Sequence, residues 1–346
     1  MKIQMLVEKY PPALGGDGIH VQNLEKYLSK DIGTSIVTKS ERETSSTERV
    51  KRVGRESSSI PGRLSFAASS VMELNKSEYD LLHAHGELCA LATKYVKRKA
   101  PVVWTIHGLW KPIMKETHGP LYPIFNHYER KALKGRYDAV IAVDSYSMGM
   151  ALKYGQKNVH LIPNGVNAER FVPANNKDSN IIAVGRLVEH KGFGYLMEAA
   201  KGLDTKVLIA GGGPLEGKLR SIAQPNVEFL GKVPQEELVP VYKKTGIFVL
   251  PSIWEGFPFT LLEAMSCECA CIATKVGGVP DLIEDGKNGI LIDVGDTKHL
   301  RESIIALLED ENYRKKLGKN ARKKIKKDFS WEKITKQTEE VYRDLI

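Results

Sequence analysis

The sequence predicts an α/β protein made of two doubly wound parallel sheets that face each other across a cleft. With 346 residues, the chain is long for one hydrophobic core and fits two domains. Short apolar runs alternate with amphipathic helical patterns, as parallel strands with crossover helices require. We therefore expect one domain over residues 1–165, a second over residues 166–328, and a C-terminal helix over residues 329–346 that packs back on the first domain.

In the first domain, apolar runs bounded by turn residues predict five buried strands: Ile3–Val7, Thr34–Val37, Leu81–His83, Val102–Ile106 and Ala139–Val143. Helical patterns lie between these runs, for example at His20–Leu28 and Gly86–Lys97. Residues 40–63 are rich in Ser, Arg and Glu and show no periodicity. That segment predicts a mobile loop.

The second domain begins after Ile162–Asn167, a segment rich in turn formers. Its apolar runs predict six strands: Ile181–Val184, Lys206–Ile209, Val227–Phe229, Ile247–Leu250, Cys271–Ala273 and Gly289–Leu291. The segment Asn312–Lys327 carries nine Lys and Arg among its sixteen residues, with Leu317, Ala321 and Ile325 at four-residue spacing. This pattern predicts a solvated helix with a narrow apolar stripe, and a helix lying on a membrane is the alternative. The last residues, Trp331–Ile346, are again helical in pattern.

Composition and charge limit the location and the partners. The chain is 42% hydrophobic and 27% charged, as in soluble proteins, and no apolar run is long enough to span a bilayer. We expect a cytoplasmic protein, with a peripheral contact at the inner membrane face left open. Residues 1–170 hold 25 Lys and Arg against 17 Asp and Glu, whereas residues 171–346 hold 26 against 25. The basic first half indicates either an anionic partner, an acceptor or a membrane, or a solubilising surface.

The four cysteines do not form a disulfide framework, and no Cys and His spacing typical of a metal site occurs. We expect buried thiols and no bound metal. A glycine turn with Gly15 and Gly16 follows the first strand and leads into a helix, where free N–H groups attract anions. The dinucleotide fingerprint needs a third glycine, but Val21 stands at its position, so a Rossmann oxidoreductase is disfavoured.

Two cations follow the strand Ile181–Val184. Because this strand belongs to a parallel sheet, Arg186 and Lys191 should lie at the carboxyl edge, where ligands bind. Arg186 offers a planar fork to phosphate oxygens, and Lys191 offers a compact point charge next to Gly192. These residues suit the neutralisation of a diphosphate.

Two carboxylates flank a helix start after the strand Ile247–Leu250. Glu255 precedes the turn that contains Pro258, and Glu263 follows about one turn inside the helix. The free N–H groups of Phe259, Thr260 and Leu261 point towards the same space. Carboxylates can hold sugar hydroxyls while the cations hold a diphosphate, so the residues indicate an enzyme that moves a sugar off a nucleotide.

Over nearly its whole length the chain resembles the retaining glycosyltransferases of family 4, which have the GT-B fold. The resemblance rests on these segments: Gly15-Gly16, Thr105-Ile106-His107-Gly108, Ile162-Pro163-Asn164-Gly165-Val166, Val184-Gly185-Arg186-Leu187 through Lys191-Gly192, Gly211-Gly212-Gly213-Pro214, Phe229-Leu230-Gly231, Glu255 with Glu263, and Lys275-Val276-Gly277-Gly278-Val279-Pro280. Relatives often carry Gly and Pro after the Glu263 helix, where this chain has Glu268 and Ala270, which indicates an altered local turn.

The resemblance implies a role for each matching residue. Arg186 and Lys191 would hold the donor diphosphate, together with N–H groups near Gly15 and Gly16 and at the Phe259–Leu261 helix start. Glu263 would accept hydrogen bonds from the ribose, and Glu255 would engage hydroxyls of the transferred sugar. His107 would face the donor sugar and the acceptor. Backbone groups near Lys232 and Val233 would recognise the base.

The resemblance also implies a hexosyl transfer by front-side attack, in which the leaving phosphate helps to deprotonate the acceptor. No Asp-x-Asp occurs in the chain, so we expect no divalent metal and no cofactor beyond the nucleotide sugar. The expected donor is a UDP-sugar, with GDP-mannose next. The acceptor, a glycan, lipid-linked or phosphorylated molecule, could meet Trp110–Lys115 and the aromatic residues Tyr122, Phe125 and Tyr128, which fit a packed helix equally well. A GT-B phosphorylase or epimerase and a non-catalytic nucleotide-sugar-binding protein are the alternatives; no nucleic-acid partner is expected.

Overall fold

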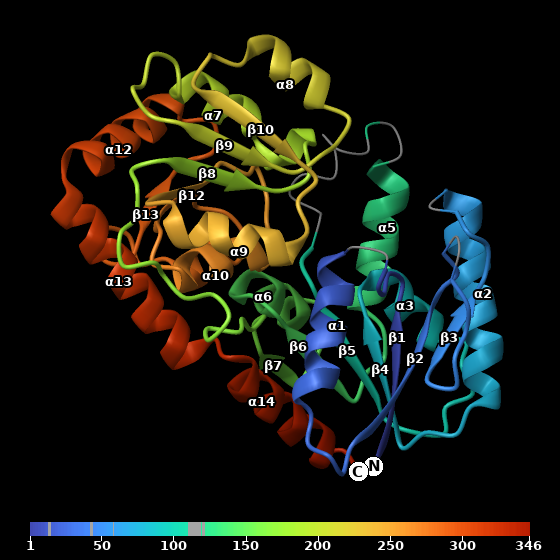
Figure 1. The fold of residues 1–346 in the computed structure, drawn as a ribbon. Coiled ribbons are helices and arrows are strands. Elements are labelled where there is room, and N and C mark those ends of the chain that lie inside the picture. The colour runs from blue at the N-terminus through green and yellow to red at the C-terminus, as the bar shows by residue number, and fades with distance from the viewer. Residues whose placement is uncertain (13–14, 42–43, 58, 110–118, 120–121) are drawn as a thin grey trace. The chain divides into compact units, whose positions relative to one another are not determined.

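The computed structural model describes residues 1–12, 15–41, 44–57, 59–109, 119 and 122–346. It divides into two compact units (Figure 1). Unit 1 comprises Met1–Asn164 and Trp331–Ile346, and unit 2 comprises Gly165–Ser330. Each unit has its own parallel sheet covered by helices, which confirms the predicted fold class of two parallel-sheet α/β domains.

The sheet of unit 1 has seven strands in the order β3-β2-β1-β4-β5-β6-β7, and neighbouring strands pair in parallel. Its strands are β1 (Lys2–Val7), β2 (Gly33–Lys39), β3 (Val50–Val53), β4 (Leu81–His85), β5 (Val102–Ile106), β6 (Ala139–Ala142) and β7 (Val159–Leu161). The five predicted strands are confirmed as β1, β2, β4, β5 and β6. The two edge strands, β3 and β7, were not predicted. Neither is fully buried, so their sequences lack the apolar run that marks a central parallel strand.

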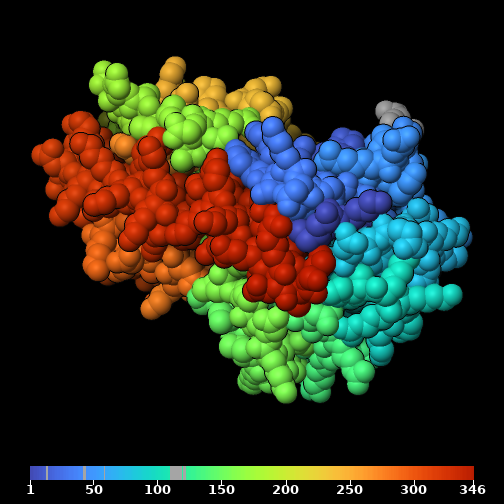
Figure 2. Space-filling model, turned by 90° about the horizontal axis from the view of Figure 1, so that it is seen from below, coloured from blue at the N-terminus to red at the C-terminus, as the bar shows by residue number. Residues whose placement is uncertain are grey.

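The described helices of unit 1 are α1 (Gly16–Tyr27), α2 (Ile60–Lys76), α3 (Glu87–Thr93), α5 (Tyr122–Leu133), α6 (Ser145–Lys153) and α14 (Trp331–Arg343). The last of these confirms the predicted C-terminal helix. It lies beside α1, with the rings of Trp331 and Tyr27 stacked at 6.4 Å between centroids. Figure 2 shows the C-terminal segment in red against N-terminal residues in blue. The backbone N–H of Ser29 donates to Glu339 Oε1 at 2.6 Å, which fastens α14 to the end of α1.

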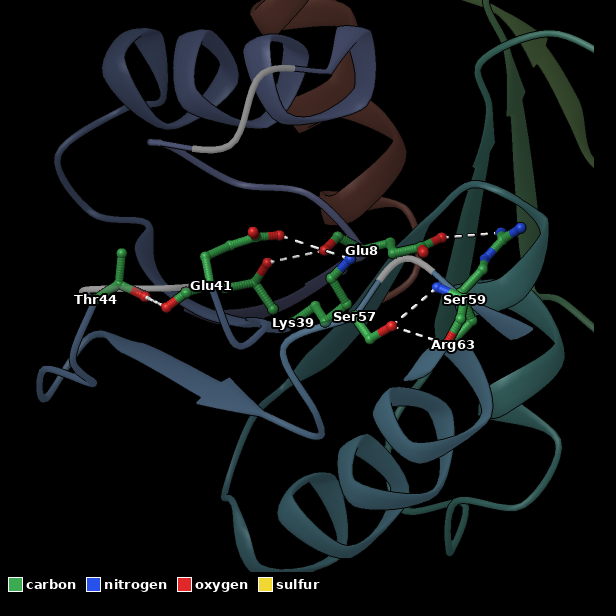
Figure 3. Close-up of polar contacts among 8 residues, drawn as sticks. Glu8, Lys39, Glu41, Thr44, Ser57, Ser59 and Arg63 are labelled. Atoms are coloured by element: carbon green, nitrogen blue, oxygen red, sulfur yellow. Dashed lines mark hydrogen bonds and ion pairs between the residues drawn. The ribbon is translucent and has the colours of Figure 1, made fainter. Parts of the chain in front are cut away.

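The prediction of a loop over residues 40–63 is wrong for two segments within it. Strand β3 occupies Val50–Val53, and α2 begins at Ile60. The Ser59 side chain caps α2 by accepting from the Gly62 N–H, and a proline in the first turn favours the helix start. Arg63 Nη2 lies 2.9 Å from Glu8 Oε2, so α2 is tied to the loop after β1 (Figure 3). The predicted helix Gly86–Lys97 is too long, because α3 ends at Thr93.

Unit 2 has a six-stranded parallel sheet in the order β10-β9-β8-β11-β12-β13. All six predicted strands are confirmed: β8 (Ile181–Val184), β9 (Val207–Ala210), β10 (Val227–Gly231), β11 (Ile247–Leu250), β12 (Ala270–Thr274) and β13 (Ile290–Ile292). The described helical elements are η2 (Glu189–Lys191), α7 (Phe193–Ala199), α8 (Glu216–Ile222), α9 (Gln235–Lys244), α10 (Phe259–Ser266), α11 (Val279–Leu282), α12 (Thr297–Glu309) and α13 (Glu311–Asp328).

The basic helix predicted near the C-terminus is confirmed as α13. Its apolar stripe of Leu317, Ala321 and Ile325 is fully buried within unit 2. The stripe is therefore not free to lie on a membrane, and that alternative is wrong. All four cysteines are buried and free, as expected. Within the described part of the chain, no helix combines the length and the apolar character needed to cross a bilayer.

Candidate functional site

In both sheets the strand order reverses next to the first strand of the unit. The reversal falls between β1 and β4 in unit 1, and between β8 and β11 in unit 2. Ligands of doubly wound sheets bind outside the carboxyl ends of the strands at such a point. The loops after β8 and β11 carry Arg186, Lys191 and Glu255, so the sheet topology places these predicted residues at the position where a ligand is expected.

The centre of the site in unit 2 is a bidentate ion pair. Lys191 Nζ lies 2.7 Å from Glu255 Oε1 and 2.9 Å from Glu255 Oε2. Ser252 Oγ donates to Glu255 Oε1 at 2.6 Å. Glu255 is only 7% exposed, whereas the Lys191 side chain is 21% exposed. The pair is thus anchored on the carboxylate side and reaches solvent on the ammonium side.

The backbone of the two loops is held in direct contact. Gly192 has φ +65°, and a Cβ atom there would lie 1.9 Å from the carbonyl oxygen of Pro251, so only glycine fits. The Ile253 N–H donates to the carbonyl oxygen of His190 at 2.8 Å. The glycine directly after Lys191 is therefore what lets the β8 loop lie against the β11 loop and bring Lys191 to Glu255.

Two further predicted cations lie at the same edge of the sheet. Arg186 follows β8 and is exposed, and its side chain forms no ion pair or hydrogen bond with any described residue. Lys232 follows β10, is also exposed, and lies beside Gly212, where a Cβ atom would come within 2.9 Å of its Cγ. Both positive charges are available to an anion. Val233 is half-buried next to Lys232.

The N-cap residue of helix α10 is Pro258, and its side chain accepts no hydrogen bond from the first N–H groups of the helix. Phe259, Thr260 and Leu261 form its first turn, where N–H groups lack partners within the helix. Glu263 lies one turn further on and is buried, and it accepts a hydrogen bond from Gln235 at the start of α9. Burial raises the pKa of the Glu263 carboxyl to about 7. The two carboxylates thus differ: Glu255 is paired with a cation, and Glu263 is paired with a neutral amide.

In unit 1, the predicted residues Gly15 and Gly16 form the start of α1. Gly15 is its N-cap residue and provides no side-chain hydrogen bond, so the first N–H groups of α1 face the end of β1 without a side-chain cap. Gly18 permits this arrangement, because a Cβ atom at that position would lie 2.4 Å from the carbonyl oxygen of Lys9. The helix start therefore approaches the β1 loop closely.

His107 belongs to a cluster of imidazoles that the sequence did not reveal. Its Nε2 lies 3.1 Å from His85 Nδ1, and its ring makes an edge contact with His20 at 4.8 Å between centroids. His20 Nδ1 in turn lies 2.9 Å from Asn164 Oδ1. The fourth ring, His83, lies 4.0 Å from His85 between centroids and is bound by Thr105 and Tyr342. The sequence contained one signal for this cluster: His83 and His85 are separated by a single residue at the end of an apolar run.

Burial keeps these imidazoles neutral. It lowers the pKa of His20 to about 4, and burial with the neighbouring rings lowers the pKa of His85 and His107 well below the ordinary value. A neutral His107 whose Nε2 is engaged by His85 has its Nδ1 left for another partner. The cluster can therefore donate and accept hydrogen bonds, but it adds no charge at neutral pH.

Within unit 2 the structure pairs Lys191 with Glu255 and places Arg186 on the same loop as Lys191. Glu263 lies inside α10, where its partner is Gln235. The structure gathers Gly15, Gly16 and His107 at the carboxyl edge of the unit 1 sheet. The predicted acceptor segment Trp110–Lys115 lies outside the described residues. Tyr122, Phe125 and Tyr128 all lie on α5.

Two family profiles divide the chain between them. The profile of Glycosyltransferase Family 4 matches residues 14–170, and that of Glycosyl transferases group 1 matches residues 166–324. The chain is 31% identical over 353 residues to an uncharacterized glycosyltransferase of Methanocaldococcus jannaschii, covering 97% of this chain and 96% of the relative. It is 28% identical to the alpha-maltose-1-phosphate synthase of Mycolicibacterium smegmatis, with 99% of both chains covered.

The fold is also similar to that of a solved structure, the Anabaena protein HepE in complex with UDP and glucose. The TM-score is 0.82 at 19% identity, and the similarity covers 100% of both chains. At that identity the similarity concerns the fold.

Proposed function

The chain belongs to the GT-B glycosyltransferases of family 4 and group 1, and we propose that it transfers a hexose from a nucleoside-diphosphate sugar to an acceptor hydroxyl with retention of configuration. The observation that carries this proposal is the Lys191–Glu255 pair at the point where the unit 2 strand order reverses. Ser252 holds the carboxylate, and the exposed Arg186 lies on the same loop as Lys191. Such a set offers cations to a diphosphate and a carboxylate to sugar hydroxyls.

Glu255 and Lys191 are paired before any ligand binds. A diphosphate that approaches Lys191 finds an ammonium already positioned by a buried carboxylate, so little side-chain entropy remains to be lost on binding. The Glu255 oxygens, in turn, have further lone pairs that can accept hydrogen bonds from a sugar. We assign Glu255 to the transferred sugar and Glu263 to the ribose, where two adjacent hydroxyls can share one carboxylate.

The reaction we propose is a front-side displacement. The bond from the anomeric carbon to the β-phosphate oxygen breaks, while a bond to the acceptor oxygen forms on the same face of the sugar. The acceptor proton passes to the leaving phosphate oxygen. Arg186, Lys191 and the first N–H groups of α10 neutralise the charge that develops on the diphosphate, which is commonly the largest catalytic contribution. No divalent metal takes part, and His107 contributes a neutral imidazole to the sugar or the acceptor.

We propose a UDP-sugar as donor, with Lys232 and Val233 next to the base, and GDP-mannose as second choice. The complex of HepE with UDP and glucose supports a uridine donor, because the fold is shared over the whole chain. The name of the maltose-1-phosphate synthase supports a phosphorylated acceptor or one of similar charge. The basic first half of the chain fits such an acceptor and a peripheral contact with an anionic membrane.

A thermal-shift screen against UDP-, GDP- and ADP-sugars tests the donor, because a ligand that binds the folded state raises its apparent stability. The best donor is then incubated with candidate acceptors in excess chelator, and the product anomer is identified by NMR. An α-linked product from an α-linked donor supports the proposal. Tight donor binding without transfer or hydrolysis would favour a non-catalytic binding protein, and an inverted product would contradict the front-side mechanism.

A further inference from the structure

Unit 1 contains a groove of about 970 Å³. None of the predicted donor-site residues lines it, and of the aromatic residues named above as possible acceptor contacts only Tyr128 does. The groove lies where α3 passes between α2 and α5 (Figure 1). Helix α3 has only seven residues, whereas α2 has 17 and α5 has 12, so α3 ends early and residues 94–100 continue in its place. These residues precede β5, and the groove thus opens towards the amino ends of the strands, whereas His107 lies at their carboxyl ends.

The helix α2 presents two apolar faces. Gly62, Phe66, Ser70 and Leu74 recur every four residues and are buried in the core. Ile60, Leu64, Ala68 and Met72 recur at the same spacing but are offset by two residues, which places them about 200° around the helix axis. This second stripe is exposed, with Leu64 at 53% and Met72 at 59%. An exposed apolar stripe on a helix that already has a buried one indicates a binding surface.

Other parts of the groove extend this apolar stripe. Tyr95, just after α3, is 71% exposed, and Tyr128 on α5 is 44% exposed, and both line the groove with Leu64. Leu88 and Leu91 of α3 line it as well, between the two helices. Six of the eleven exposed large hydrophobic residues in the described part of the chain belong to α2, α5 or Tyr95, and all six are in unit 1. The tyrosines offer apolar rings with polar tips, a combination that favours a membrane interface.

The groove is strongly basic. Its lining contains no Asp or Glu among the described residues, but seven cations: Lys94, Lys97, Arg98, Lys99, Lys131, Lys134 and Arg136. Arg98 pairs with Asp138, and Lys99 pairs with Glu78. The other five form no ion pair with any described carboxylate. Five unpaired cations around an apolar surface repel one another unless an anionic partner covers them.

We infer that this face of unit 1 binds the anionic surface of a lipid bilayer. The exposed stripe of α2 with Tyr95 and Tyr128 enters the boundary between headgroups and acyl chains, and the lysines around it contact lipid phosphates. This is the arrangement of an interfacial helix with basic flanks. A second copy of the chain is a poorer occupant, because the described groove lining carries no acidic residue and the two carboxylates beside it, Glu78 and Asp138, are already paired with Lys99 and Arg98. The inference rests on the groove and is independent of the proposed transfer reaction.

Sedimentation with vesicles tests this assignment. Binding is measured to vesicles of equal parts phosphatidylglycerol and phosphatidylcholine, and to pure phosphatidylcholine. The triple variant Lys97→Gln, Lys131→Gln and Lys134→Gln should lower the partition coefficient for anionic vesicles on the order of a hundredfold, at about fivefold per basic residue. The matched control is Lys316→Gln, Lys319→Gln and Lys323→Gln, which removes the same charge from exposed positions of α13. Equal losses in the two triple variants would overturn the assignment, as would equal binding of the native chain to neutral vesicles.

A second pair of variants tests the apolar part. Leu64→Gln changes a residue that is 53% exposed on α2, and Ile222→Gln changes one that is 46% exposed on α8. Only Leu64→Gln should weaken vesicle binding, by about tenfold, while donor-induced thermal shifts stay unchanged in both variants because neither residue is near the transfer site. Sedimentation without vesicles gives the oligomeric state. A dimer that Leu64→Gln dissociates would show that a second copy occupies the groove and would overturn the membrane assignment.

Discussion

Unit 1 and unit 2 are built on the same alternation of strands and helices, yet the carboxyl edges of their sheets carry opposite chemistry. In unit 2 this edge holds a buried carboxylate paired with Lys191 and an unpaired arginine. In unit 1 it holds four imidazoles that burial keeps neutral. The difference teaches that one sheet topology can carry different chemistry: at this edge unit 2 presents charged side chains, and unit 1 presents neutral imidazoles.

The charge distribution of unit 1 strengthens the contrast. Its unpaired lysines lie around the groove at the amino edge of the sheet, away from the imidazoles. In unit 2 the carboxyl edge carries exposed cations as well as carboxylates.

The cations of unit 2 should control turnover. Arg186→Ala and Lys191→Met each remove one positive charge near the diphosphate, and each should cost roughly 3–4 kcal/mol in the transition state, on the order of a hundred- to a thousandfold in rate. Turnover should suffer more than donor affinity, because the charge is largest in the transition state. Steady-state kinetics in excess chelator are the measurement. Near-normal turnover in both variants would contradict the residue assignment, and activity restored only by magnesium or manganese would contradict the metal-free mechanism.

The two carboxylates of unit 2 should separate nucleotide from sugar. Glu263→Gln should weaken the free nucleoside diphosphate by about 1.5–3 kcal/mol, the range for hydrogen bonds to a charged group. Glu255→Gln should leave that affinity unchanged or improve it, since it frees Lys191 from its partner, but it should strongly reduce sugar transfer. Calorimetry with nucleoside diphosphate and with nucleotide sugar measures both. If Glu255→Gln weakens the two ligands equally, the separation of roles is wrong.

The pH dependence of nucleoside-diphosphate binding is a second test of the role of Glu263. Burial holds the pKa of Glu263 at about 7 in the free protein, whereas a carboxylate that accepts two ribose hydroxyls must be ionised. Binding therefore releases a proton below pH 7, and affinity should fall up to tenfold for each pH unit below that value. The Glu263→Gln variant retains all the other titrating groups, and the phosphate of the ligand titrates as before. Its affinity should therefore lack the part of the pH dependence that comes from Glu263. Identical pH profiles for the native chain and the variant would contradict the role of Glu263.

The histidine cluster should make unit 1 sensitive to acid. The pKa of His20 is about 4 in the folded state and 6.5 when unfolded, so the unfolded state binds more protons between these values and stability is lost as pH falls from 6.5 towards 4. One unit of pKa corresponds to about 1.4 kcal/mol, so His20 alone should cost roughly 2 kcal/mol between pH 6.5 and 5. Burial raises the pKa of Asp17, and it raises the pKa of Glu87 to about 7; both shifts offset part of this loss.

Glu263 in unit 2 has the opposite sign. Its pKa is raised from 4.5 to about 7, so the folded state holds the proton more tightly and stability is lost as pH rises between these values. Hydrogen exchange at pH 7 and pH 5, corrected for intrinsic rates, should show protection falling in α1 and β4 on acidification and rising in α10, which carries Glu263. The control variant His20→Gln does not titrate and should reduce the loss in unit 1. Equal loss of hydrogen-exchange protection in both units would contradict the opposite pH dependences expected for His20 and Glu263.

The smallest effect concerns a turn in unit 2. Glu268 is the one non-glycine residue with positive φ, at 58°, in the described part of the chain, and it stands where relatives often have glycine. Glu268→Gly relieves that conformation and should stabilise unit 2 by roughly 0.5–1 kcal/mol. The control Glu237→Gly lies inside the right-handed helix α9 and should destabilise by about 1 kcal/mol. The denaturant midpoints of the two variants show whether each substitution stabilises or destabilises the protein. A destabilising Glu268→Gly would contradict the strain argument.

The sequence by itself determined the central strands, the basic helix α13, and the chemical types at the unit 2 site. Central parallel strands are buried on both faces, so they appear as continuous apolar runs such as Ile181–Val184. Arg186, Lys191 and Glu255 could be identified because each follows such a run, and the carboxyl ends of parallel strands share one edge. Edge strands such as β3 gave no such signal.

Only the tertiary structure decided which residues meet. The pairing of Lys191 with Glu255 depends on β8 lying next to β11, although 64 residues separate the two side chains. His107 meets His85 because β4 and β5 are neighbours, and it meets His20 because α1 packs over their ends. Likewise, the exposed stripe of α2 is distinguishable from its buried stripe only when the neighbouring helices are in place. Local periodicity encodes the elements, but contacts between distant segments depend on how the sheet orders its strands, and that order follows from the packing of the whole unit.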